Sequence, residues 1–131
     1  MFQGQSVSES RRRLGRRGEA AAEVFLRERG YRIIGRGWRP NGWKRGEIDL
    51  IAEHGDEVVF VEVKTRINRS YGRPEEAVDW RKQRQLRLLA WSWLKEHQAH
   101  GRQYRIDVIG ITWKKGAILV RHLINAVGAD G

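Results

Sequence analysis

The sequence contains no cysteine, and this absence excludes disulfide bonds and thiolate-bound metal sites. It also lacks a run of about 18 apolar residues, the length that a membrane-spanning helix needs. Residues 1–20 carry several arginines but no apolar stretch of the kind that a secretory signal contains. No internal repeat, low-complexity stretch or linker divides the chain. From these absences we expect a cytoplasmic protein that does not enter a membrane.

Positive charge is abundant. The chain has 26 Lys and Arg residues against 16 Asp and Glu residues, which gives a net charge of +10. Such a charge attracts polyanions by steering them and by releasing their counterions. The basic residues gather at 11–13, 16–17, 38–45 and 81–84. Aromatic residues, which can stack on bases, lie near several of these clusters. Nucleic acid is therefore the expected partner, and a merely solubilising surface is the alternative.

The size and composition predict one folded domain. The chain has 131 residues, of which 40% are hydrophobic, and this is enough for a single core. We expect a flexible basic arm at residues 1–12, one domain at residues 13–127 and a short tail at residues 128–131.

The apolar periodicity predicts an α/β or α+β domain with one sheet flanked by helices. Helical spacing indicates a first helix over 13–29 and a second over 80–97, whose apolar stripe begins at Leu86. A short strand is expected over 31–36. The last predicted strands cover residues 104–113 and 117–123, and a loop is expected over residues 70–74.

A hairpin is predicted where GEIDLIA and EVVFVEVKT are separated by His54-Gly55-Asp56. A two-residue turn that begins with Gly55 suits a type II′ hairpin. That turn sets Asp49 opposite Glu62, and opposed residues point to the same face of a sheet. Glu47, Asp49, Glu62 and Lys64 are then predicted to converge on one face. The other face is predicted to carry Ile48, Leu50, Val59, Val61 and Val63.

Two opposed carboxylates repel each other and need compensating charge if both are to stay ionised in a partly buried place. A hard divalent cation is one solution, because Mg²⁺ is usually bound by one or two carboxylates together with water and phosphate. Lys64 adds further positive charge where a phosphate or an attacking water would approach. The alternative is that Glu62 and Lys64 form an ordinary surface pair, and Glu47 could be either a partner of Lys64 or a ligand.

Asp49 followed by Glu62-Val63-Lys64 resembles the D…E-x-K signature of the PD-(D/E)xK nuclease superfamily, which includes restriction enzymes and archaeal Holliday junction resolvases. From about Gly15 to Val127 the chain is more closely similar to the YraN-like family of small bacterial proteins. Two positions differ: Gly37 stands where that family usually has asparagine, and Ile48 where the superfamily has proline. The matching pieces are Gly18-Glu19-Ala20, residues 46–51, residues 60–66, Tyr71-Gly72, residues 82–84, residues 105–108 and residues 124–126.

The resemblance implies a restriction-endonuclease-like fold, with a central mixed sheet, flanking helices and an antiparallel hairpin that carries the site. It implies that Asp49, Glu62, the backbone carbonyl of Val63 and Glu19 bind Mg²⁺ or Mn²⁺. It also implies that Lys64 orients the attacking water and stabilises charge on the phosphate. For Glu19 the alternative is a carboxylate that complements the positive end of the first helix.

The sequence thus predicts a metal-dependent DNA endonuclease of the bacterial cytoplasm or nucleoid. Contacts to phosphates carry little sequence information, so branched or flapped DNA is the expected substrate, and a junction resolvase would act as a homodimer. The alternatives are a non-catalytic nucleic-acid-binding module and a subunit of a DNA-processing assembly. The predicted nucleic-acid-binding residues are Arg39, Lys44, Arg45, Arg66, Arg81, Lys82, Gln83 and Arg84, of which residues 82–84 could instead form a solvated helix end.

Two further expectations concern polar residues outside this site. Arg105 and Asp107 are predicted to form a structural pair across strands. The four histidines show no metal-binding spacing, and we expect no chemistry from them.

Overall fold

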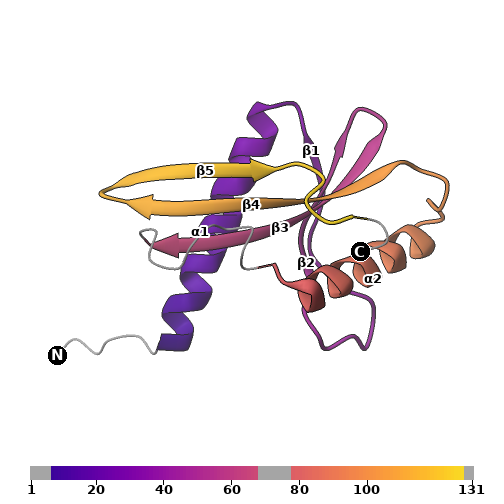
Figure 1. Ribbon diagram of the computed structural model, residues 1–131, viewed down its shortest axis with the longest axis horizontal. Helices are drawn as coiled ribbons and strands as arrows, with labels where there is room; N and C mark the ends of the chain where they lie inside the picture. Colours follow the sequence, from indigo (N-terminus) through magenta and orange to yellow (C-terminus); the bar gives the residue numbers. More distant parts are fainter. Residues whose placement is uncertain (1–6, 68–77, 129–131) are drawn as a thin grey trace.

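The computed structural model describes residues 7–67 and 78–128. Five strands form one sheet in the order β1-β2-β3-β4-β5, in which β3 and β4 are parallel and the other neighbours are antiparallel. The predicted α/β arrangement, one mixed sheet with two helices, is confirmed (Figure 1). The loop expected over residues 70–74 lies outside the described residues. The elements are α1 (Val7–Glu28), β1 (Arg32–Trp38), β2 (Ile48–His54), β3 (Glu57–Ile67), α2 (Trp80–Glu96), β4 (Tyr104–Lys114) and β5 (Ala117–Leu123).

Helix α1 begins at Val7, six residues before its predicted start. Arginine favours helix, and Glu9 in the first turn complements the positive end of the helix dipole. The basic residues at 11–13 therefore lie on α1, and the prediction that residues 7–12 belong to a flexible arm is wrong. The helix ends where predicted, before Gly30, whose φ of +86° suits a residue without a side chain.

The two helices cover opposite faces of the sheet. Alternate strand residues face different helices: Val59 and Val61 pack with α1, whereas Val58 and Phe60 pack with α2. Figure 1 shows α1 crossing the long strands steeply and α2 lying along the other side of the sheet near β2. The apolar stripe predicted for α2 is confirmed, because these residues are all buried: Leu86, Leu89, Ala90, Trp93 and Leu94.

The predicted hairpin and its register are confirmed over most of its length. Gly55 has a φ of +59°, as the first position of a type II′ turn requires. The antiparallel pairs run from His54 with Glu57, through Ile51 with Phe60, to Leu50 with Val61.

The prediction for Ile48 is wrong, because this residue packs with the α2-side core rather than with Leu50. Its partner on β1 is Trp38, which follows Gly37. Gly37 has a φ of +54°, in the left-handed region, and Trp38 directly after it packs against the α2-side core. Asparagine also tolerates that conformation, so the glycine at this position satisfies the same backbone requirement.

Asp107 and Arg105 do pair, but along β4 and not across strands, with Arg105 Nε 3.0 Å from Asp107 Oδ1. Asp107 is fully buried and also accepts hydrogen bonds from His122 Nε2 at 2.8 Å and from the Asn125 N–H at 2.9 Å. Arg105 reaches on to the hydroxyl of Tyr31 at 2.5 Å. This network of hydrogen bonds connects β4 with β5 and with the segment that follows α1.

Among the described residues, neither helix is both long enough and apolar enough to cross a membrane.

Candidate metal and nucleic-acid site

Asp49 lies where the two strands of the hairpin separate. The last registered pair between β2 and β3 is Leu50 with Val61. One residue further, the Asp49 side chain takes the place of a backbone partner: its Oδ2 accepts the Val63 N–H at 2.8 Å. The carboxylate is therefore held against β3, next to Glu62, instead of pointing freely into solvent.

Glu62 is a buried carboxylate with two ammonium partners. Its side chain is 3% exposed, and its Oε2 lies 3.3 Å from the Nζ of Lys64 and 3.3 Å from the Nζ of Lys82. A buried carboxylate is costly unless it is paired, and here the pairing comes from both β3 and α2. The prediction that Glu62 and Lys64 share a face is confirmed, and Glu62 is too buried to belong to an ordinary surface pair.

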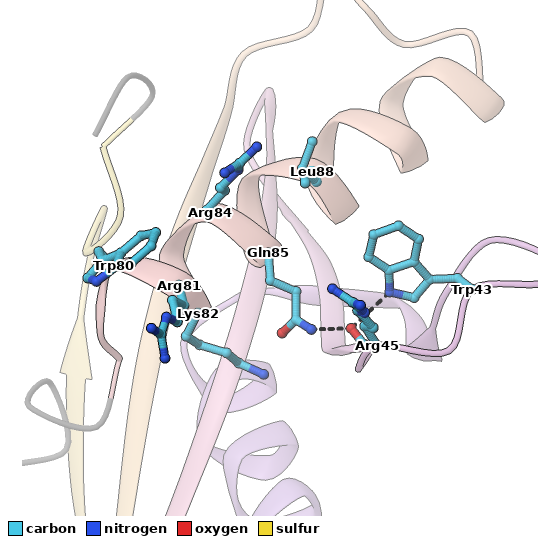
Figure 2. A pocket seen from close by; sticks show the side chains of 8 residues that line it. All are labelled: Trp43, Arg45, Trp80, Arg81, Lys82, Arg84, Gln85 and Leu88. Carbon is cyan, nitrogen blue, oxygen red and sulfur yellow. Dashed lines mark hydrogen bonds between the residues drawn. The ribbon is translucent and has the colours of Figure 1, made fainter.

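Lys82 is predicted to contact phosphates, and the structure adds a contact that the sequence does not predict: its ammonium lies beside the Glu62 carboxylate. Helix α2 begins with the cap residue Asp79, whose side chain accepts the Lys82 N–H at 3.0 Å. That cap fixes Lys82 in the first turn, from which its side chain extends toward the strands (Figure 2).

Glu19 reaches the same site because α1 passes very close to β3. A Cβ on Gly18 would lie only 1.8 Å from Thr65 Oγ1, so no larger residue fits at this crossing. Glu19 follows directly and is half-buried. Its pKa is raised by burial and by the negative charges of Glu47 and Glu62, which outweigh the opposite effect of Arg16. The carboxylate of Glu47 lies beside Gly37.

The carboxylates of this site crowd one another. Burial raises the pKa of Asp49 to about 8, with further contributions from the charges of Glu62 and Glu19. The hydrogen bond from Val63 and the charge of Lys82 act in the opposite direction without cancelling the rise. The ionised form of Asp49 is therefore not fully compensated by the groups of the protein alone. Among residues 7–67 and 78–128, no three Asp, Glu or His side chains are gathered closely enough to form a metal-binding group by themselves.

A pocket of about 570 Å³ lies between α2 and the loop that precedes β2 (Figure 2). Sequence reasoning placed Arg45, Arg81 and Arg84 at a nucleic-acid surface, and all three line it. It did not anticipate the apolar and amide residues that complete the lining. The full lining is Trp43, Arg45, Trp80, Arg81, Lys82, Arg84, Gln85 and Leu88.

The remaining predicted nucleic-acid contacts are dispersed. Arg39 and Lys44 are exposed in the loop between β1 and β2, and Arg66 lies half-buried near the end of β3. Gln83 uses its amide within the chain, because its Nε2 donates to the Val78 carbonyl at 3.0 Å. The structure thus brings four of the eight predicted contacts to the pocket, namely Arg45, Arg81, Lys82 and Arg84.

Comparison with known proteins gives one consistent result. The model of the uncharacterised protein family UPF0102 matches residues 18–111. A UPF0102 protein of Rhodococcus opacus is 51% identical over 98 residues, which cover 75% of this chain and 80% of that protein. A UPF0102 protein of Beutenbergia cavernae is 45% identical over 112 residues, covering 84% and 92% respectively. One of Pelotomaculum thermopropionicum is 39% identical over 122 residues, covering 92% and 99%.

Proposed function

This chain belongs to the UPF0102 family, and we propose that it is a metal-dependent DNA endonuclease that hydrolyses phosphodiester bonds in branched or flapped substrates. The observation that carries the proposal is the placement of Asp49 and Glu62, with Lys64 and Lys82, beside a cationic pocket. A protein that only binds phosphates has no need of buried carboxylates facing them. The mixed sheet and its hairpin agree with a restriction-endonuclease-like fold, which we propose together with the function.

The donor set fits a hard divalent cation. Asp49 and Glu62 would hold Mg²⁺ or Mn²⁺ together with the Val63 carbonyl, and Glu19 would help to complete the site. Burial, and after it the charges of neighbouring carboxylates, raises the pKa of Asp49 and of Glu19, and this supports the assignment because a bound cation would stabilise the ionised forms. When bound, such an ion polarises a phosphoryl oxygen and makes hydroxide available near neutral pH.

The two lysines have complementary parts in this proposal. Without substrate, both ammonium groups neutralise Glu62. If Glu62 were bound to a cation, Lys64 would be free to orient a water and to meet the negative charge that develops on the phosphate. Lys82 enters from α2 and also lines the pocket, so it would hold the phosphate next to the carboxylates.

Recognition of the DNA would rest on contacts to its phosphate backbone. The arginines of the pocket and the exposed loop residues Arg39 and Lys44 would position phosphates, which fixes orientation without reading bases. Cleavage of a four-way junction would require two such sites and hence a homodimer.

A second candidate is a non-catalytic nucleic-acid-binding module, alone or within a DNA-processing assembly. The pocket favours it, because its arginines and tryptophans could bind a strand without using either carboxylate. This alternative predicts tight, salt-sensitive binding that is indifferent to Mg²⁺ and survives the substitution Glu62→Gln.

The test is a cleavage assay on labelled four-way junction, flap, single-stranded and linear duplex DNA, each with Mg²⁺, Mn²⁺ or EDTA. The proposal predicts metal-dependent cutting of at least one structured substrate by the wild type and none by Glu62→Gln. Binding of these substrates without cutting in either metal would contradict the nuclease and favour the binding module.

A further inference from the structure

The pocket between α2 and the loop before β2 has two tryptophans at its ends and cationic side chains between them (Figure 2). We propose that it binds unpaired nucleotides, whose bases stack on Trp43 and Trp80 while Arg45, Arg81 and Arg84 hold their phosphates. If the pocket binds unpaired nucleotides, the DNA to be cut would carry a single-stranded segment beside the scissile phosphate. This substrate preference rests on the function proposed above.

The two indole rings are suited to stacking. Trp80 is 66% exposed on the first turn of α2, although a ring of this size is normally largely buried. Trp43 is held firmly, because its ring packs against the α2-side core and its Nε1 donates to the Arg45 carbonyl at 2.9 Å. Base–aromatic stacking needs a free face on the base, which unpaired nucleotides offer and duplex interiors do not.

The charge of the pocket matches a phosphate backbone. Four of its eight lining residues are cationic, and none of these lining residues is acidic. The Arg81 guanidinium lies over the Trp80 ring at 5.3 Å, so a stacked base and its phosphate would meet both groups together. Aromatic platforms combined with a cationic track are the usual means of binding single strands without reading their sequence.

The loop side of the pocket is attached to the helix. The Gln85 amide donates to the Arg45 carbonyl, and Gly46 approaches the same side chain so closely that an added Cβ would lie 2.9 Å from Gln85 Nε2. Gly46 also has a φ of +82°. A preformed site loses less entropy when it binds a flexible strand.

Lys82 connects the pocket to the carboxylate site. It lines the pocket, and its ammonium lies 3.3 Å from Glu62. A strand stacked between Trp43 and Trp80 would therefore lead one of its phosphates to Asp49 and Glu62. This adjacency explains how an unpaired segment would be presented for cutting.

The test measures binding of a fluorescently labelled oligodeoxythymidine strand by anisotropy in EDTA, so that its result does not depend on cleavage. Trp80→Ala is expected to weaken binding about tenfold or more, and Trp80→Phe to retain most of it. The matched control is Trp91→Ala, which removes an indole that is 55% exposed on the same helix outside the pocket; its affinity should match the wild type.

Two further probes separate stacking from charge. An abasic strand of equal length keeps the phosphates but loses the bases, and it should bind the wild type as weakly as the normal strand binds Trp80→Ala. Equally tight binding of the abasic strand, or equal losses in Trp80→Ala and Trp91→Ala, would overturn the proposal. A ribonucleotide strand of equal length shows whether the protein prefers ribose or deoxyribose. Weaker binding of either strand by Trp80→Ala than by the wild type supports the proposed stacking in the pocket. Metal-dependent cutting of fully paired DNA alone would overturn this inference and leave the nuclease intact.

Discussion

The ammonium of Lys82 on α2 lies as close to the Glu62 carboxylate, at 3.3 Å, as does the ammonium of Lys64 on the same strand as Glu62. One buried carboxylate is thus shared by a lysine of the E-x-K pattern and by a lysine that is 18 residues further along the sequence from Lys64. The site is built from the hairpin and the start of α2 together.

Lys82→Met is expected to slow cleavage about 10²- to 10³-fold, the effect of removing one preorganised charge partner from a transition state. The measurement is single-turnover cleavage of the preferred substrate at saturating protein. Lys95→Met removes an exposed lysine from the last turn of the same helix and should leave the rate unchanged. Equal rates for Lys82→Met and wild type would show that Lys82 only stabilises Glu62 in the free protein.

Mg²⁺ is expected to stabilise the folded protein through Asp49 and Glu62. At a Mg²⁺ concentration ten times its Kd, linkage adds about 1.4 kcal/mol to the free energy of unfolding. Thermal denaturation with and without Mg²⁺ should show this gain in the wild type and not in Asp49→Asn or Glu62→Gln. Glu96→Gln, at an exposed position on α2, should retain it. A gain that persists in both site variants would place the cation elsewhere.

Gly18→Ala is expected to destabilise the fold, because the new methyl group would collide with Thr65 where α1 crosses β3. Overpacking of this kind costs about 1–3 kcal/mol. Gly15→Ala is the matched control, since nothing lies within 4 Å of an added Cβ there and alanine favours helix by about 0.8–1 kcal/mol. Urea denaturation of both variants should give opposite signs, and a stable Gly18→Ala protein would contradict the close crossing.

Asp107→Asn is expected to reduce the loss of unfolding free energy that occurs when the pH is lowered. Burial alone would raise the Asp107 pKa, but hydrogen bonds from His122, the Asn125 N–H and Arg105 lower it below its ordinary value. The stabilisation is then present above the unfolded-state pKa of about 3.9 and is lost as the pH falls through the lower folded-state pKa.

Unfolding free energies measured between pH 7 and pH 2 should therefore fall less steeply for Asp107→Asn than for the wild type. At pH 7 the variant should be about 3–5 kcal/mol less stable, because it removes the buried carboxylate that binds Arg105, His122 and the Asn125 N–H together. Asp56→Asn, in the exposed hairpin turn, serves as the control and should follow the wild-type curve. Parallel curves for Asp107→Asn and wild type would show that another group governs the acid dependence.

Local chemistry was enough to predict the hairpin and the two residues that share its polar face. The turn at Gly55-Asp56 sets the register, and the register sets which side chains face each other. The turn could not show that the strand pairing ends at Leu50 with Val61, or that the Asp49 side chain accepts the Val63 N–H beyond that pair.

The role of α2 could not be predicted in the same way. Its apolar stripe indicated the buried face, and this was confirmed. That its first turn reaches Glu62 follows from the parallel pairing of β3 with β4, which α2 connects. A helix that connects two parallel strands begins near the end of the first strand. The sequence did not specify that β3 and β4 are parallel neighbours. The early start of α1 was missed because charged residues at an exposed helix end carry no apolar periodicity.

The most direct test of the central claim is a paired measurement of cleavage and binding for the wild type and Lys64→Ala, on the same junction or flap substrate with Mg²⁺. The account predicts that Lys64→Ala binds the substrate with nearly wild-type affinity and does not cut it. Undiminished cutting by Lys64→Ala would contradict the assigned site, and simultaneous loss of fold and binding would show that Lys64 serves the structure instead.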